Sequence, residues 1–335
     1  MTSDATALFL RSDEVSDLAE PAEYVDAVRA GYRERGEGAP ATPRTTLFSD
    51  DPAGMLTGYL AILPETGAMG GYTYAAGFGE RDAHFSLPIF DSQSGAPLAV
   101  LDGASMNPHK TGAAGAVGVD ALARRDASDL AVIGSGAQAR GQVRATATVR
   151  SFDRVEVYSP TAEHREAFAA EMNDALDATV AAVASSAAAI EGADVVITAT
   201  DASEPVFDGD LLEDGTHVTA MGQYHPEKHE LDATTIERAK YVPDLRERVA
   251  NDAGSFLNAL DEGVVDEDHV HAELGDVVAG TAPGRESPDE ITVFDSGGTA
   301  IETVAAGYML YERAKSEGRG EEIEFAPASE ALTGR

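Results

Sequence analysis

The sequence contains no cysteine and no long hydrophobic run. The lack of cysteine excludes disulfides and thiolate chemistry, so that a structural zinc site would need histidine and carboxylate ligands alone. No apolar stretch reaches the roughly 18 residues that span a bilayer. The first 20 residues also lack a basic region followed by an apolar one. We therefore expect neither a membrane span nor a secretion signal, and we expect the protein to be cytoplasmic.

Basic residues are also scarce, with 24 against 59 acidic residues and a formal charge of −35. Such a surface repels nucleic-acid phosphates and anionic lipids, so neither is expected as a partner. Only four basic residues are lysines: Lys110, Lys228, Lys240 and Lys315. A high content of acidic residues and a low content of lysine favour a halophilic protein. At 1 M salt the Debye length falls to about 3 Å, so that the repulsion between the acidic side chains is screened. The alternative is an acidic enzyme of ordinary salt.

The 335 residues suffice for two domains. Residues 1–126 mix one amphipathic helix, Ala22 to Tyr32, with short strand-like segments, and the turn DSQSG is expected to join two strands as a hairpin. This part does not resemble a nucleotide-binding fold. It indicates an α+β domain.

From residue 127 onward, an apolar strand, a turn and a helix alternate repeatedly. Most of these strands are continuous apolar runs, which is typical of parallel strands buried on both faces. The α/β pattern predicts a Rossmann-type doubly wound domain over residues 127–312. The long helix that begins at Ile301 is expected to return to the first domain, which then comprises residues 1–126 and 313–335.

The strongest local signal is a G-x-G-x-x-A turn between the first of these strands and its helix. Gly134 permits the tight turn, Gly136 allows backbone amides to approach a pyrophosphate, and Ala139 lets the helix pack closely. We predict a dinucleotide here. The alternative is a glycine-rich turn without a ligand. The predicted contacts in this turn are Gly134, Gly136, Ala137 and Gln138.

The end of the second strand indicates which dinucleotide is bound. An acidic residue there would bind the ribose hydroxyls of NAD, but the segment Tyr158–Thr161 contains none. Ser159 and Thr161 with the nearby cation Arg165 suit a 2′-phosphate, so NADP(H) is favoured and NAD(H) is possible. The alternative is that Arg165 only decorates a solvated helix.

Taken together, these features resemble the ornithine cyclodeaminase and mu-crystallin family over nearly the whole chain. The matching features are Arg44, the DSQSGAPLAVLDG stretch, Lys110–Thr111, Val132–Gly136, Ala193–Val196 with Thr200, the G-x-x-x-x-x-K-x-E-L pattern of Gly222 to Leu231, Ala272–Gly275 with Ala279–Gly280, and Ile291–Thr292 to Ala300. Their order and spacing carry the resemblance.

The resemblance implies a homodimeric NAD(P)-dependent enzyme that transfers a hydride at the α-carbon of a small amino or imino acid. In the family the first domain, completed by the C-terminal segment, holds the substrate and forms the dimer interface, and the second holds the cofactor. Arg44 and Lys110 match the positions that bind the substrate carboxylate. Thr200 and Lys228 are expected at the cofactor. Lys228 matches a position that the family fills with lysine or arginine, where a structural or cofactor contact and a catalytic role both stay open.

The sequence departs from the family pattern at three substrate positions. Thr73 replaces a lysine, Lys110 replaces an arginine, and Gln223 replaces the aspartate that cyclodeaminases use near the substrate amine. Because an amide does not titrate near the working pH, Gln223 disfavours the ring closure of ornithine to proline and favours imine reduction or amino-acid dehydrogenation. The expected catalytic residues are Lys110, Gln223 and His225, with His225 either a proton donor or a capping residue.

Three functions therefore stay open. The first is an imino acid reductase or amino-acid dehydrogenase, the second is ornithine cyclodeaminase, and the third is a crystallin-like dinucleotide-binding protein with little activity. No metal is expected, because the pair His269 and His271 lacks a third inward-facing ligand.

Overall fold

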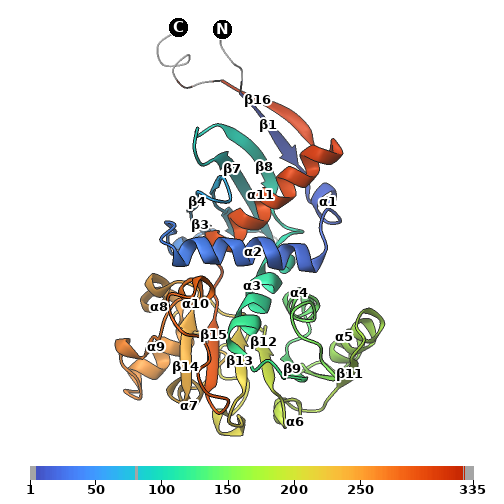
Figure 1. Cartoon of the computed structure of the whole chain (residues 1–335), viewed down its shortest axis with the longest axis vertical. Coiled ribbons are helices and arrows are strands. Elements are labelled where there is room, and N and C mark those ends of the chain that lie inside the picture. Colours follow the sequence, from blue (N-terminus) through green and yellow to red (C-terminus); the bar gives the residue numbers. More distant parts are fainter. Residues whose placement is uncertain (1–4, 80–81, 327, 329–335) are drawn as a thin grey trace. The chain divides into compact units, whose positions relative to one another are not determined.

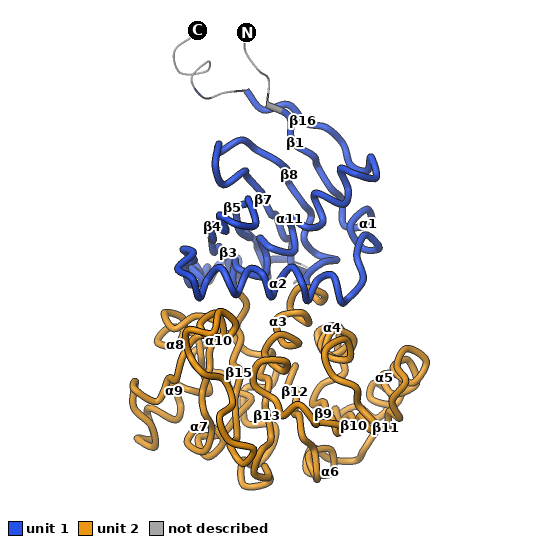
Figure 2. The backbone as a smooth tube through the Cα atoms, in the orientation of Figure 1, with its two compact units in different colours: residues 1–107, 299–335 blue, residues 108–298 orange. Residues whose placement is uncertain are grey.

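The computed structural model describes residues 5–79, 82–326 and 328. They form two compact units, drawn in different colours in Figure 2: unit 1 comprises residues 1–107 and 299–335, and unit 2 comprises residues 108–298. Each is built around its own sheet.

Unit 2, all of whose residues are described, contains a seven-stranded sheet with the order β11-β10-β9-β12-β13-β15-β14, in which every pairing is parallel. Its strands are β9 (Asp129–Ile133), β10 (Arg154–Tyr158), β11 (Thr179–Ala182), β12 (Val195–Thr198), β13 (His217–Ala220), β14 (Ala239–Pro243) and β15 (Ile291–Asp295). Its helices are α3 (Asn107–Leu122, from Pro108 onward), α4 (Ala137–Thr146), α5 (Ala162–Ala175), α6 (Ser186–Ile190), α7 (Ala233–Arg238), α8 (Arg246–Asp252), α9 (Gly254–Asp261) and α10 (Leu274–Ala279), with 3-10 turns η1 (Gly209–Leu211) and η2 (Glu267–His269). This is the predicted doubly wound domain.

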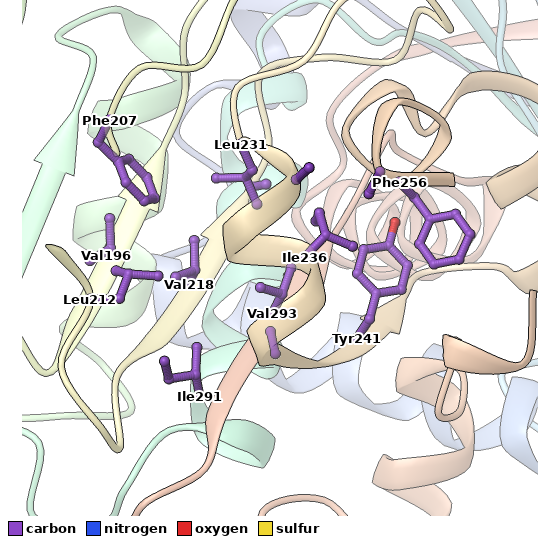
Figure 3. Close-up of a cluster of buried hydrophobic side chains, with 14 of the residues drawn as sticks. Val196, Phe207, Leu212, Val218, Leu231, Ile236, Tyr241, Phe256, Ile291 and Val293 are labelled. Atoms are coloured by element: carbon purple, nitrogen blue, oxygen red, sulfur yellow. The ribbon is translucent and has the colours of Figure 1, made fainter. Parts of the chain in front are cut away.

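The apolar runs of the sequence form the centre of this sheet. The four residues of β12 and the four of β13 are all buried, as parallel strands covered on both faces require. Figure 3 shows one side of the resulting core, where Val218, Ile236 and Val293 lie among other buried apolar side chains. Strand order reverses between β9 and β12, so the crevice at their carboxyl ends is the expected ligand position.

The described residues of unit 1 form a nine-stranded mixed sheet with the main order β16-β1-β8-β7-β6-β3-β2, to which β4 and β5 are attached. The elements are β1 (Ala5–Leu10), α1 (Ser12–Val15), α2 (Pro21–Gly36), β2 (Thr45–Asp50), β3 (Ala53–Gly58), β4 (Ala61–Leu63), β5 (Ala68–Gly70), β6 (Thr73–Ala76), β7 (Ala83–Asp91), β8 (Pro97–Asp102), α11 (Ala300–Glu317) and β16 (Glu321–Phe325). Helix α2 and the β7–β8 hairpin confirm the predicted helix and the DSQSG turn.

The units divide at 107/108 and 298/299, which differs from the predicted boundaries of 126/127 and 312/313. Helix α3 lies against the Rossmann elements because Gly112 lacks a side chain: a Cβ there would meet the Gly141 carbonyl oxygen at 2.3 Å. Helix α11 lies along α2 in unit 1 (Figure 1), and a Cβ on its Gly307 would meet Leu87 at 2.6 Å. Helix α3 therefore belongs to unit 2 and not to the first domain, where the predicted boundary placed it. Helix α11 packs within unit 1, as expected of the helix that begins at Ile301, although the predicted boundary left its residues up to 312 in the second domain.

The polar C-terminal stretch also forms structure. Residues Glu321–Phe325 pair antiparallel with β1 as the edge strand β16, although most of their side chains are exposed. Acidic side chains on an exposed edge strand discourage pairing with another chain.

Candidate functional site

The predicted glycine turn lies where strand order reverses in unit 2. Gly134 directly follows β9 and has a φ of +122°, a conformation that only glycine adopts readily. A Cβ at Gly134 would also meet the Ala199 carbonyl oxygen, just after β12, at 2.3 Å. Both the positive φ and the close carbonyl require glycine at this position, where the ends of β9 and β12 approach each other.

The other side of this turn is open. Gly136 is the N-cap of α4, and a Cβ there would meet nothing within 4 Å. The amides of the first turn of a helix have no intrahelical acceptors and attract an anion. The Gln138 Oε1 atom is buried and has no hydrogen-bond partner among the described residues. The open backbone amides at the N-terminus of α4 fit the pyrophosphate of a dinucleotide, whereas the Gln138 oxygen is an acceptor and would need a donor from a ligand.

Arg140 fixes the turn, a role that the sequence did not reveal. One of its Nη atoms donates to the carbonyl oxygens of Ser135 and Gly136, and its Nε donates to Glu171 Oε2 at 2.6 Å. Two carbonyls of the turn are thereby occupied by a cation from α4. In the sequence, the only indication of this contact is that Arg140 stands four residues, about one helical turn, after Gly136.

The residues predicted to select the dinucleotide gather at the end of β10. Ser159 is buried, and its hydroxyl shares a 2.9 Å hydrogen bond with the Ser135 hydroxyl in the glycine turn. Thr161 is the N-cap residue of α5. Arg165 donates to the Ser159 carbonyl oxygen at 2.9 Å, and its guanidinium lies 5.8 Å from the centre of the Tyr158 ring. The loop therefore presents hydroxyls and a cation, with no carboxylate in its sequence.

Glu230 organises the next part of this edge and was missed as an individual residue. Its carboxyl is 1% exposed and accepts four hydrogen bonds. Oε1 accepts from the Thr200 amide and hydroxyl, both at 2.7 Å. Oε2 accepts from the Thr198 hydroxyl at 3.0 Å and the Gly222 amide at 2.7 Å. Burial raises the pKa of Glu230, and the four donors oppose that shift.

Gln223 lies next to this network. Its Nε2 donates to the Thr200 carbonyl oxygen at 3.2 Å. A small pocket in unit 2 is lined by Gln223 together with Ala220, Glu230, Gly254, Ser255 and Asp295. The amide is therefore held at the carboxyl ends of β12 and β13.

His225 and Lys228, from the same loop, have local backbone roles. The Glu227 amide donates to His225 Nδ1 at 3.1 Å, and the Lys228 amide donates to the His225 carbonyl oxygen at 3.1 Å. A Cβ on Gly254 would meet the Lys228 carbonyl oxygen at 2.0 Å. The His225 ring therefore caps its own turn, which agrees with the capping role considered for it in the sequence.

Lys110 is the predicted carboxylate-binding cation in unit 2, on α3. Its side chain is 2% exposed. The carbonyl of the next residue, Thr111, accepts from Gln142 Nε2 at 2.9 Å, which fixes α3 against α4. Burying one of only four lysines is costly unless the ammonium interacts with partners.

The other predicted substrate residues, Arg44 and Thr73, lie in unit 1. Arg44 precedes β2, and its guanidinium lies 5.3 Å from the centre of the Tyr59 ring. The Tyr59 ring is 6.0 Å from that of Tyr72, whose hydroxyl donates to the Gly103 carbonyl oxygen at 2.8 Å. Thr73 begins β6 and is exposed. Gly58 pairs with both Thr45 and Thr73, so the chain places Arg44 and Thr73 in neighbouring parts of one sheet. Tyr59 carried no sequence motif, and Tyr72 stood only as the variable residue before Thr73.

The histidines considered for a metal each bond to a backbone carbonyl. His269 Nε2 lies 2.7 Å from the Ile236 oxygen, and His271 Nε2 lies 2.8 Å from the Pro283 oxygen. Within the described ranges, no group of three histidine, aspartate or glutamate side chains is placed to hold a metal ion.

None of the helices in the described part of the chain combines the length and apolar character needed to cross a membrane.

The parallel sheet, the open glycine turn and the polar strand ends define a Rossmann-type dinucleotide-binding protein. The model of the ornithine cyclodeaminase/mu-crystallin family matches residues 6–318. The chain belongs to this family.

Three relatives illustrate what the family members do. The chain is 36% identical over 248 residues to a Δ1-pyrroline-2-carboxylate reductase of Bacillus cereus, covering 74% of this chain and 76% of the relative. The structure of the Thermococcus litoralis Δ1-pyrroline-2-carboxylate reductase with NADH and L-proline matches with a TM-score of 0.89 and 33% identity, covering 94% of this chain and all of the other. An archaeal alanine dehydrogenase dimer with bound NAD matches with a TM-score of 0.89 and 32% identity, covering 96% and 99%.

Proposed function

We propose that this protein is an NAD(P)-dependent oxidoreductase that reduces a small α-imino acid or oxidises the corresponding α-amino acid. When bound, the reduced nicotinamide supplies a hydride to the imine carbon, the C=N π electrons move to the nitrogen, and the protonated imine becomes an amine as the cofactor is oxidised. The protein's residues bind the substrate and the cofactor, orient them toward each other and exclude water from between them.

The observation that carries this proposal is the position of Gln223 at the sheet edge that bears the open glycine turn. Its amide is held by the Thr200 carbonyl, and an amide does not titrate near neutral pH, so it cannot serve as a general acid or base. A protonated imine accepts hydride directly and needs only a hydrogen-bond acceptor for its N–H. Release of ammonia from ornithine needs a group that titrates near the working pH.

We assign a carboxylate-binding role to Lys110 in unit 2 and, separately, to Arg44 in unit 1, as the family resemblance implies. A carboxylate prefers charged donors, and charge-assisted hydrogen bonds are about twice as strong as neutral ones. Lys110 is 2% exposed, and a charge shielded from water interacts more strongly with a charged ligand than a charge in solvent does. Lysine gives up the two-pronged geometry of the family's arginine.

We further propose a preference for NADP(H) over NAD(H). Ser159, Thr161 and Arg165 occupy the end of β10, where an acid would repel a 2′-phosphate. The solved relatives named above carry NADH and NAD. The proposed preference for NADP(H) therefore rests on this chain's own residues at the end of β10. The measurement is kcat/KM for each cofactor at a saturating concentration of the imino acid.

We propose that the protein is a homodimer that uses the β2–β3 hairpin. Leu47 and Phe48 on β2 are 65% and 70% exposed, and Leu56, opposite Leu47 on β3, is 46% exposed. Large apolar side chains gathered on one exposed hairpin mark an interaction surface.

The proposed reaction is tested with a panel of substrates and both cofactors in molar salt. The panel contains cyclic imino acids, pyruvate with ammonia, iminosuccinate and ornithine. Oxidation of NADPH by an imino acid supports the proposal. Formation of proline from ornithine with only trace NAD identifies a cyclodeaminase, and tight nucleotide binding without turnover identifies a crystallin-like protein.

Substitution of Lys110 tests the carboxylate assignment. Lys110→Ala is expected to raise the KM of the imino acid at least tenfold, because one charge-assisted contact is worth about 1.5–3 kcal/mol. The Kd of the nucleotide serves as the internal control and is expected to be the same in the parent and in Lys110→Ala. Unchanged turnover of every active substrate would exclude Lys110 from carboxylate binding.

A further inference from the structure

The buried carboxyl of Glu230 connects two parts of the site that lie far apart in the sequence. Oε1 binds Thr200, which follows β12, and Oε2 binds Gly222, which follows β13. All four oxygen contacts are with donors, two of them backbone amides that cannot reverse. The carboxyl thereby fixes the distance and orientation between the two strand ends.

Gln223 is held from both sides by this arrangement. Its backbone follows Gly222, whose amide donates to Glu230 at 2.7 Å. Its side chain donates to the carbonyl oxygen of Thr200, the residue whose amide and hydroxyl Glu230 also binds. Because a backbone carbonyl only accepts hydrogen bonds, the NH₂ group of the Gln223 amide must face Thr200. The amide oxygen is then the atom left for a ligand.

We propose that Glu230 is a positioning residue that holds the Gln223 amide with Nε2 on Thr200, so that Gln223 Oε1 accepts a hydrogen bond from the substrate's protonated imine nitrogen. This inference rests on the proposed function. It specifies the substrate as the protonated form, since an acceptor oxygen stabilises N–H⁺ and not an unprotonated imine nitrogen. It also explains how an amide can occupy the position of the family's aspartate.

Glu230→Gln tests the proposal with a change of one atom. The new NH₂ group must face either the Thr200 pair of donors or the Gly222 and Thr198 pair, so one half of the bridge is broken. We expect kcat for the imino acid to fall about 10- to 100-fold, the scale of a displacement of about 1 Å at a reacting centre. The Kd of NADPH should change much less than kcat, because most of its expected contacts come from the glycine turn and the end of β10 and only Thr200 is shared with the Glu230 network.

A double-mutant cycle separates positioning from general structural damage. If Glu230 acts through Gln223, then Glu230→Gln has little further effect on kcat in a Gln223→Ala background. Independent, multiplicative losses from the two substitutions would overturn the proposal. If Glu230→Gln does not fold, Thr200→Val replaces it, because it removes one donor to Glu230 while keeping the side-chain shape; a smaller loss with the same dependence on Gln223 is expected.

Asp194 provides the matched control, since its carboxyl lies at the opposite end of β12. It accepts from the amides of Ser128 and Asp129 at 2.7 and 3.1 Å and forms an ion pair with Arg124. Asp194→Asn makes the same carboxyl-to-amide change away from the site and also removes this ion pair, and kcat is expected to stay within about twofold of the parent. A loss equal to that of Glu230→Gln would show that the effect is not local.

A measurement without turnover distinguishes this inference from the reaction. The side-chain amide hydrogens of Gln223, assigned by NMR through their loss in Gln223→Ala, should exchange slowly in the parent and rapidly in Glu230→Gln. If exchange changes but no imino acid is reduced, the proposed function fails and the positioning role stands. If exchange is the same in both proteins, the positioning role is wrong whichever reaction is catalysed.

Discussion

Acidification provides a direct test of the buried His217 at the start of β13. Its ring is fully buried, with Nδ1 2.9 Å from the Thr292 hydroxyl and Nε2 3.0 Å from the Thr219 hydroxyl. Burial, with smaller contributions from the charges of Arg285 and Arg150, lowers the pKa of His217 from 6.5 to about 3. The folded protein therefore keeps this ring neutral at pH values where the unfolded chain protonates it.

The sign and the size of the effect follow from this difference in proton binding. As the pH falls through 6.5, the unfolded state takes up a proton that the folded state does not, so the free energy of unfolding decreases. Between about pH 7.5 and about pH 5.5, one such histidine lowers it by about 1.4 kcal/mol. Both pH values lie well above 3, so this magnitude depends on the ordinary pKa of the unfolded chain and hardly on the folded value.

The assay is urea denaturation of the parent and of His217→Gln at fixed salt, followed by circular dichroism because the chain has no tryptophan. The variant is expected to be less stable at pH 7.5, and its stability should fall by about 1.4 kcal/mol less than that of the parent on acidification. Comparing the two proteins cancels the titration of the carboxylates. His164→Gln, at an exposed position on α5, serves as the control. Equal pH dependence in the parent and in His217→Gln would refute the neutral buried ring.

Arg165→Ala should raise the KM for NADPH about tenfold and that for NADH much less, since one phosphate contact is lost; equal effects on both cofactors would exclude a 2′-phosphate role. Phe48→Glu should yield a monomer in sedimentation analysis if the exposed hairpin forms the dimer interface, and an unchanged mass would place the interface elsewhere. Arg248→Met should lower the free energy of unfolding by about 3–5 kcal/mol, because Asp244, Asp252 and Asp295 would be left without their buried cation; a loss below about 1 kcal/mol would contradict that account. Finally, the melting temperature should rise between about 0.1 and 2 M potassium chloride as the excess of acid is screened, and sucrose at matched water activity should not reproduce the full rise.

The sequence predicted those features that depend on local pattern or on residues adjacent in the chain. Continuous apolar runs such as β12 identify a strand buried on both faces. The G-x-G spacing identifies the turn at Gly134, because the steric requirement lies in the backbone of that residue itself. The boundary between the units was harder, because the position of α3 depends on what it packs against, such as the Gly141 carbonyl beside Gly112, and a helical pattern does not identify that partner.

The parts of the site that the sequence did not disclose depend on contacts between distant segments. Glu230 stands in a stretch that carries the family pattern, yet a glutamate in a loop of so acidic a chain reads as solvated surface. Its role follows only when β12 and β13 lie side by side, with Thr200 and Gly222 donating to one carboxyl. The same holds for His217, whose two threonine partners lie on its own strand and on β15. Among the 59 acidic residues several carboxyls are buried, including those of Glu230 and Asp244, and which of them are buried depends on the assembled fold and not on the local sequence.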